Sequence, residues 1–203
     1  MLNYFQIINE VVNPEVGRTY KIYVVHVTLV TKKALEIGRQ LGLSEASLEL
    51  IEVAGMLHDI GVVAVKSPKM DCTGELSYIA HGVAGAAILR TWAEKNQAEL
   101  NEKELELLEK AALVAERHIG VGLTAQEVAA RGLPLPAGVD YLPTSLEEQI
   151  ITFADLFFSK REATLWQEES ADQIEKELTE YGEEQVEVFR TWREKFTKQE
   201  GQS

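Results

Sequence analysis

Apolar helical segments that end in ligand-type side chains are the feature that most constrains this chain. Residues 54–61 read AGMLHDIG, so His58 and Asp59 follow directly on an apolar segment. Ile51 and His58 are seven positions apart, which places them on one face of a helix. Two polar groups at the end of a buried stripe are costly unless hydrogen bonds or a ligand satisfy them. The segment therefore predicts a buried polar site at the end of a helix.

The other three histidines of the chain occur in the same setting. Each lies on or beside the apolar face of a predicted helix, and one aspartate near residue 155 continues such a face as well. Because the chain has only four histidines, this shared placement predicts that several helices present imidazole or carboxylate groups to one interior. The residues of this predicted cluster are His26, His58, Asp59, His81, His118 and Asp155.

Each of these groups alone has a structural explanation. A single histidine on an apolar face is usually a hydrogen-bonded core residue, and a single aspartate near a helix end is usually a cap. Converging imidazoles, however, repel one another when charged and cannot all satisfy one another when neutral. A metal ion removes both problems, and a mixed His and Asp set favours Fe, Mn, Co, Ni or Zn over Ca or an all-oxygen Mg site.

Apolar residues recur at spacings of three and four along most of the chain, which predicts an all-α fold. Capping patterns predict where several helices begin. The predicted helices are 24–40, 45–59 after the N-cap Ser44, 78–94, 101–118, a short helix opened by TAQE at 124–127, and one opened by SLEE at 145–148. The segments 61–77 and 119–144 are predicted loops, with 62–65 as a candidate short extended piece.

The last forty residues differ in composition from the rest. They are rich in Glu and carry Phe189, Trp192 and Phe196 at helical spacing. Such a stripe packs on the core or on a partner subunit more often than on a ligand. We therefore divide the chain into a domain of residues 1–163 and an acidic helical extension of residues 164–203, and consider a homodimer paired through the stripe.

Composition limits the partners that we expect. The formal net charge is −13, from 33 acidic and 20 basic residues, so a long nucleic acid is not an expected partner. No apolar run is long enough to cross a bilayer, the N-terminus lacks a signal-peptide pattern, and Cys72 stands alone. These features predict a cytoplasmic protein with no membrane partner.

The ordered set of ligand-type residues resembles the HD superfamily of metal-dependent phosphohydrolases. The matching elements are His26, the HDIG tetrapeptide at 58–61, and Asp155 directly after an alanine, and the resemblance covers roughly residues 20–161. It implies an all-α HD-domain helical bundle around a buried metal site. It also implies hydrolysis of a phosphomonoester, phosphodiester or phosphoanhydride bond in a nucleotide or another small phosphorylated substrate.

His81 and His118 extend the minimal ligand pattern, and the extended set looks like the two-metal branch of the family. Carried over, Asp59 would bridge two divalent transition-metal ions. His26, His58 and Asp155 would bind the first ion, whereas His81 and His118 would bind the second.

The block from 116 to 155 resembles a group of small prokaryotic HD proteins without an assigned substrate, and more distantly the symmetrical diadenosine-tetraphosphate hydrolases. The Ala-Asp-x5-Arg pattern of the latter matches Ala154, Asp155 and Arg161. Val62 stands where both the hydrolases and the cyclic-dinucleotide phosphodiesterases usually carry Lys, and the Gly-Tyr-Pro element of the phosphodiesterases is missing.

The chemistry implied by the resemblance is attack on phosphorus by a water that the metals activate. Besides Asp59, the residues that we expect to assist catalysis are the cations Lys66, Lys69, Arg117 and Arg161, which would stabilise charge on the phosphoryl oxygens. Each of them could instead be a solvated surface charge. Two alternative functions stay open: a metal- or nucleotide-binding regulatory protein without turnover, and a di-iron oxygenase of the HD type.

Overall fold

The computed structural model describes residues 2–15 and 17–197, and nearly all of its regular structure is helical, as the sequence predicted. The α-helices are α1 (Tyr4–Val12), α2 (Gly17–Gln40), α3 (Glu45–Leu57), α4 (His81–Lys95), α5 (Glu102–Arg117), α6 (Ala125–Ala130), α7 (Leu146–Asp155), α8 (Ala171–Thr179) and α9 (Glu183–Thr197). The prediction of an all-α fold is confirmed.

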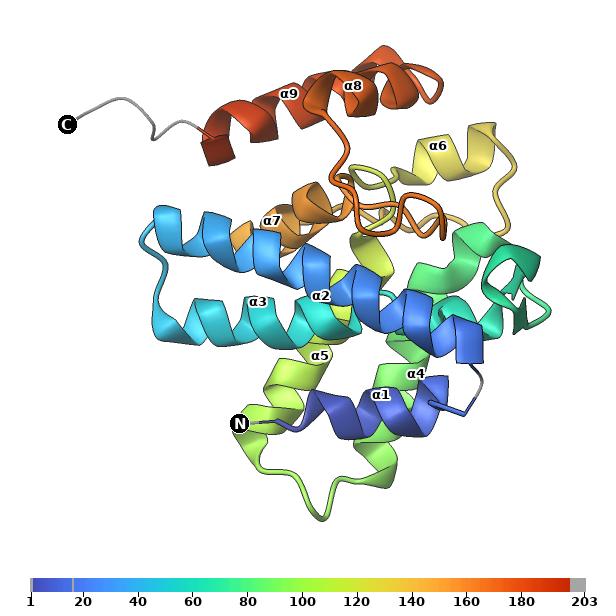
Figure 1. Cartoon of the computed structure of the whole chain (residues 1–203), viewed down its shortest axis with the longest axis vertical. Coiled ribbons are helices and arrows are strands. Elements are labelled where there is room, and N and C mark those ends of the chain that lie inside the picture. The colour runs from blue at the N-terminus through green and yellow to red at the C-terminus, as the bar shows by residue number, and fades with distance from the viewer. Residues whose placement is uncertain (1, 16, 198–203) are drawn as a thin grey trace.

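The helices pack around α3 (Figure 1). This helix contacts α2 on one side and α5 on another, while α7 contacts all three. The helix α4 pairs with α5, and α1 lies beside α3. The core of buried apolar side chains is continuous through these helices. Its fully buried members include Ile22, Ile51, Leu89, Leu108 and Phe153, which come from five different helices. These five helices therefore share one buried interior.

The helix starts follow the capping patterns of the sequence. The Ser44 side chain accepts a hydrogen bond from the backbone of Ser47 at the start of α3. Asn101, Thr124 and Ser145 each form a complete capping box at the starts of α5, α6 and α7. Such caps satisfy backbone N–H groups that have no partner within the helix. They fix the starts of α3, α5 and α7, whose opposite ends carry ligand-type residues, and the start of α6.

The segment between α3 and α4 is more ordered than a simple loop. It contains 3₁₀ turns at Ile60–Ala64, Pro68–Met70 and Tyr78–Ala80, and an antiparallel pair of two-residue strands, β1 (Lys66–Ser67) and β2 (Cys72–Thr73). The expected extended piece at 62–65 is wrong for its first three residues, because the Val62 N–H bonds back to the carbonyl of Asp59 and continues the turn. Two-residue strands are too short to show an alternating pattern in sequence.

Glycines bring the start of α4 against its neighbours. A Cβ on Gly82 would lie 2.6 Å from the carbonyl oxygen of Ala115 in α5. A Cβ on Gly61 would overlap the carbonyl oxygen of His81. Only glycine permits backbones to approach this closely. The approach draws His81 toward the ends of α3 and α5.

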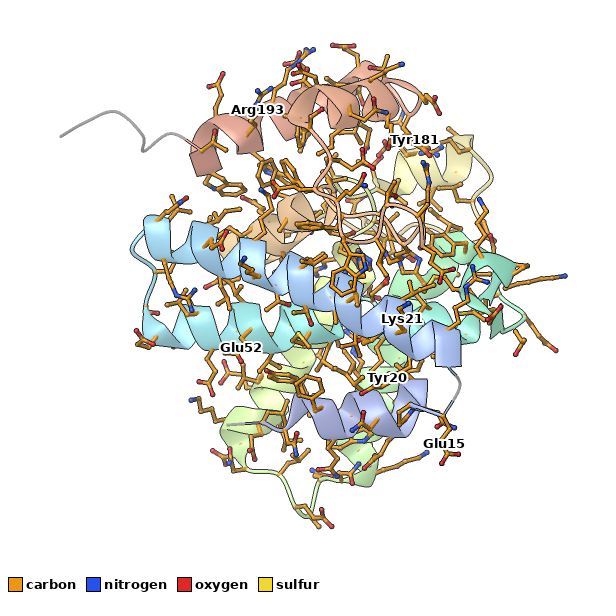
Figure 2. The ribbon with its side chains drawn as sticks, in the orientation of Figure 1. Glu15, Tyr20, Lys21, Glu52, Tyr181 and Arg193 are labelled. Carbon is orange, nitrogen blue, oxygen red and sulfur yellow. The ribbon has the colours of Figure 1, made fainter. Side chains whose placement is uncertain are left out.

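The C-terminal helices form a layer over α7, on the opposite side of the molecule from α1 (Figure 1). The Phe153 ring of α7 lies 5.4 Å from the ring of Phe189 and 5.3 Å from that of Phe196. Phe189, Trp192 and Phe196 are all buried. Arg193, in contrast, lies on the outer side of this layer (Figure 2), where it pairs with Glu175.

The aromatic stripe thus packs on the chain's own core, so pairing of two subunits through this stripe is wrong. Homodimer formation itself stays a prediction. The division of the chain at residue 163 also stays a prediction, and residues 198–203 of the expected extension lie outside the described part. None of the helices in 2–15 and 17–197 combines the length and the apolar character that a membrane span requires.

Candidate metal centre

Six ligand-type side chains converge in the interior where the C-terminal ends of α3, α5 and α7 meet α2 and the start of α4. His26 projects from the middle of α2, whereas His81 is the first residue of α4. Each of the five helices thus contributes a residue at the point where it reaches the shared interior. The full set, in chain order, is His26, His58, Asp59, His81, His118 and Asp155, and all but Asp155 are buried.

Three of the histidines are oriented by the same local bond. The Nδ1 atom of His58 lies 2.7 Å from the carbonyl oxygen of Gly55. The equivalent distances are 2.6 Å from His81 to Tyr78 and 2.8 Å from His118 to Ala115. A carbonyl oxygen can only accept, so Nδ1 carries the proton and donates it. Each Nε2 atom is then left with a free lone pair that points into the cluster, which is the arrangement that metal-binding histidines need.

The inward-facing atoms form two groups. In the first, Asp155 Oδ1 lies 2.9 Å from His26 Nε2 and 3.4 Å from His58 Nε2. In the second, Asp59 Oδ1 lies 3.2 Å from His81 Nε2 and 3.7 Å from His118 Nε2. The other carboxylate oxygen of Asp59 faces His26 at 3.9 Å, so this aspartate contacts both groups.

These atoms need a cation between them. The Nε2 atoms of His81 and His118 are 3.1 Å apart, and neither carries a proton when Nδ1 does. Among the described residues, eight buried side-chain nitrogen or oxygen atoms lack a hydrogen bond, and six of the eight belong to His26, His58, Asp59 and Asp155. Buried polar atoms are rarely left unpaired. Facing lone pairs of nitrogen and carboxylate oxygen therefore fit a bound metal ion.

The ligand atoms are close enough for this. Three sets of three residues each place one donor atom apiece within 4.8 Å of one another. These sets are His26 with His58 and Asp59, His58 with His118 and Asp155, and Asp59 with His81 and His118. The overlap of the sets makes the site a single cluster rather than separate pairs.

One residue that contacts the cluster escaped the sequence reasoning. The ammonium group of Lys160 lies 3.2 Å from Asp59 Oδ2 and 4.0 Å from Asp155 Oδ1, and only 15% of its side chain is exposed. Lys160 follows α7 in an irregular segment, where helical periodicity cannot predict the direction of a side chain. Its signal in the sequence was its position five residues after Asp155, next to the Arg161 that the resemblance singled out.

The cluster strongly shifts the pKa values of its charged members. Burial alone would raise the pKa of Asp59, but the Lys160 ammonium and the neighbouring imidazoles hold it far below its usual range. The pKa of Asp155 is likewise well below normal, since Lys160, His26 and His58 outweigh its burial. In turn, the two carboxylates and Tyr78 raise the pKa of Lys160 despite its burial. Both carboxylates are therefore ionised and available as ligands.

Burial dominates at two of the histidines. It lowers the pKa of His26 to about 4, with Lys160 acting in the same direction. It also lowers the pKa of His81 to about 4. At His58, burial is outweighed by Asp155 and Asp59, and the pKa is raised. His26 and His81 are thus neutral at pH 7, as metal ligation requires.

The four cations expected from sequence lie elsewhere. Lys66, Lys69 and Arg161 are exposed, and Arg117 donates to Thr144 at 3.0 Å and to Glu148 at 3.1 Å. Within residues 17–197, none of the four has a hydrogen bond or ion pair with the cluster. Their catalytic role stays a prediction, whereas Lys160 contacts the cluster directly.

The fold and the site together define a helical protein with a buried His and Asp centre of the kind that holds divalent metals. A family model for the HD domain matches residues 23–158, which is more than half of the chain. The chain therefore belongs to the HD domain family, as the sequence analysis expected. HD domains bind divalent metals and are generally hydrolases.

The chain is also similar to three curated proteins. It is 41% identical over 119 residues to "Uncharacterized protein MJ0778" of Methanocaldococcus jannaschii, a match that covers 58% of this chain and 54% of that protein. This similarity agrees with the expected kinship to prokaryotic HD proteins without an assigned substrate.

The other two relatives are both named tRNA (cytidine(56)-2'-O)-methyltransferase. The Thermoplasma volcanium protein is 28% identical over 134 residues, which is 66% of this chain and 31% of that protein. The Picrophilus torridus protein is 30% identical over 130 residues, which is 64% of this chain and 29% of that protein. The chain thus spans about half or less of the curated relatives that it matches.

Proposed function

We propose that this protein is a metal-dependent phosphohydrolase that cleaves a phosphoester or phosphoanhydride bond of a small phosphorylated substrate. The observation that carries the proposal is the set of facing lone pairs around Asp59 and Asp155, together with membership of the HD family. Such a set needs cations, and two-metal sites of this type serve phosphoryl transfer.

In this proposal, two divalent transition-metal ions share the cluster. His26, His58 and Asp155 would hold one ion, while His81 and His118 would hold the other, and Asp59 contacts both groups of ligands. Ions bound there would supply Lewis acidity, which polarises phosphoryl oxygens and activates water at neutral pH. The proposed metals are Fe, Mn, Co, Ni or Zn, because imidazole-rich sets suit them.

The protein's own residues contribute orientation and charge. The carbonyls of Gly55, Tyr78 and Ala115 fix three imidazoles with their Nε2 atoms inward, so the ligand set is formed before any substrate arrives. Lys160 stands at the edge of the cluster and can donate to a phosphoryl oxygen that gains charge in the transition state. Tyr78 and the two carboxylates raise the pKa of Lys160, so its side chain stays charged.

The substrate in this proposal is small. The net charge of −13 disfavours a long nucleic acid, because phosphate backbones need clustered Lys and Arg. A small phosphorylated compound, such as a nucleotide, needs only the local positive charge of bound metals and Lys160. The methyl transfer named for two relatives belongs to proteins of which this chain matches less than a third, and we do not carry it over.

A phosphoester panel with matched variants tests the proposal. The metal-loaded protein should release phosphate from at least one nucleotide or sugar phosphate, and Asp155→Asn should lower kcat by about 100-fold or more. Asp172→Asn is the control, since Asp172 is an exposed aspartate of α8. Oxygen uptake during turnover of an organophosphonate or polyol would point instead to oxygenase chemistry. Metal and nucleotide binding without turnover of any compound would point to a regulatory protein.

A further inference from the structure

A cavity lies directly beside the proposed metal centre, and the C-terminal helices form one of its walls. Its volume is about 290 Å³. His81 and Tyr78 line it on the side of the metal centre, whereas Ile174, Leu178 and Tyr181 line it on the side of α8. A ligand bound here would therefore touch both a proposed metal ligand and the C-terminal extension.

Two exposed aromatic rings stand at this cavity. Tyr78 is 40% exposed and Tyr181 is 56% exposed, so both rings are accessible to a ligand. Figure 2 shows Tyr181 between α8 and α6. The guanidinium group of Arg131, just after α6, packs over its ring at 5.3 Å from the centroid. Arg131 thus holds the ring while a large part of it stays open to a ligand.

The walls of the cavity are tied together by a buried amide. Gln185, at the start of α9, donates from Nε2 to the carbonyl of Gly122 at 3.2 Å and to Glu127 Oε1 at 2.9 Å. Gly122 adopts a φ of 99°, a conformation that glycine tolerates best. This link joins the C-terminal helices to the segment after His118. The cavity wall is therefore a built part of the fold and not a loosely placed tail.

We propose that this cavity receives the base of a mononucleotide whose phosphate lies at the metal centre, and that Tyr181 stacks on that base. The inference rests on the proposed function for the position of the phosphate. Aliphatic side chains with two aromatic rings suit the planar, largely apolar face of a nucleobase, and stacking on tyrosine tolerates every base.

The size of the cavity limits the ligand. Pockets for drug-sized molecules run from about 300 to 1,000 Å³, so a cavity of about 290 Å³ is at the lower end. One nucleoside group is expected to fit, and a second one is not. The C-terminal extension would then set specificity as well as stability.

Equilibrium binding tests this inference without relying on turnover. The probe is a non-hydrolysable phosphonate analogue of adenosine 5′-monophosphate, compared by calorimetry with the ribose analogue that lacks the base. The metal-loaded wild-type protein should bind the adenosine analogue about tenfold more tightly or better. Tyr181→Ala should remove this preference, and Tyr181→Phe should retain it. Phe5→Ala, which alters an exposed ring of the distant α1, should change nothing.

The outcomes separate this inference from the proposed function. Equal binding of the two analogues, or an unchanged preference in Tyr181→Ala, would overturn the role of the cavity even if phosphoesters are hydrolysed. A preference that depends on Tyr181, in a protein that hydrolyses no phosphoester, would support the cavity and overturn the proposed hydrolase.

Discussion

Lys160 and Asp59 form a buried ion pair, with the ammonium nitrogen 3.2 Å from Oδ2 of the carboxylate. Asp59 is fully buried and lies two residues after the end of α3, whereas Lys160 comes from the irregular segment after α7. The pair therefore connects the HD dipeptide with a cation about a hundred positions later in the chain. It also places a positive charge at the edge of the proposed metal centre.

Replacing Lys160 with methionine should separate its catalytic from its structural role. Loss of the ammonium group should lower kcat for phosphoester hydrolysis by about 100-fold, because a charge-stabilising donor is removed. The metal content should stay unchanged, since Lys160 is not a ligand. Lys110→Met, which alters an exposed lysine of α5, is the control. A rate that equals the wild-type rate would contradict the assigned role.

The same variant should behave differently in stability measurements with and without metal. In the metal-free protein, Lys160→Met leaves the buried Asp59 and the partly buried Asp155 without their cation. Breaking a buried pair costs about 3–5 kcal/mol of unfolding free energy. Bound metal supplies positive charge to the same carboxylates, so the loss should shrink in the metal-loaded protein. Urea denaturation of both forms measures it, and equal losses would show that the carboxylates do not bind metal.

Metal binding should stabilise the fold. A ligand present at 100 times its Kd raises the unfolding free energy by about 2.7 kcal/mol, which for a chain of this size corresponds to a rise in Tm of about 5–10 °C. Thermal melts with added Mn²⁺ or Zn²⁺ should show this rise. The shift should be lost in Asp59→Asn and kept in Asp172→Asn. A full shift in Asp59→Asn would exclude Asp59 from the centre.

Arg117 offers a test of a role predicted from the sequence. Arg117 directly precedes His118 in the chain. Its guanidinium group donates hydrogen bonds to Thr144 and to the buried Glu148 of α7. We expect Arg117→Ala to destabilise the protein by about 1–3 kcal/mol, because Glu148 loses its buried partner. Arg18→Ala, which breaks an exposed pair with Glu162, should cost less than about 1 kcal/mol. A loss of kcat in Arg117→Ala without a loss of stability would favour the catalytic role instead.

The C-terminal helices should contribute strongly to stability. Phe189 is fully buried and stacks on Phe153, so Phe189→Ala should cost about 3–5 kcal/mol. Val188→Ala changes a neighbouring residue that is 36% exposed and should cost far less. Denaturation monitored by circular dichroism would measure both. A near-neutral Phe189→Ala would indicate that residues after 163 fold as a separate unit.

The sequence predicted α3, α5, α6 and α7 and their starts because capping residues and apolar spacing are local signals. It did not predict α1, and α2 begins at Gly17, before the predicted start at residue 24. It also predicted that six ligand-type residues share one interior, since each lies on an inner helix face. Lys160 was missed because it lies in an irregular segment, where position is set by tertiary packing. Val62 was misjudged for a similar reason, because the turn that contains it depends on a backbone bond to Asp59. The cavity at Tyr181 depends on how α8 packs, which no local pattern reports.

The central claim is that the six converging residues hold metal, and elemental analysis tests it most directly. The protein should be purified anaerobically without a metal-binding tag and, where needed, reconstituted with Fe, Mn, Co, Ni or Zn. We predict about two equivalents of transition metal per chain, reduced in His118→Ala and unchanged in Asp172→Asn. A protein that retains no metal after reconstitution with any of these ions would contradict the account.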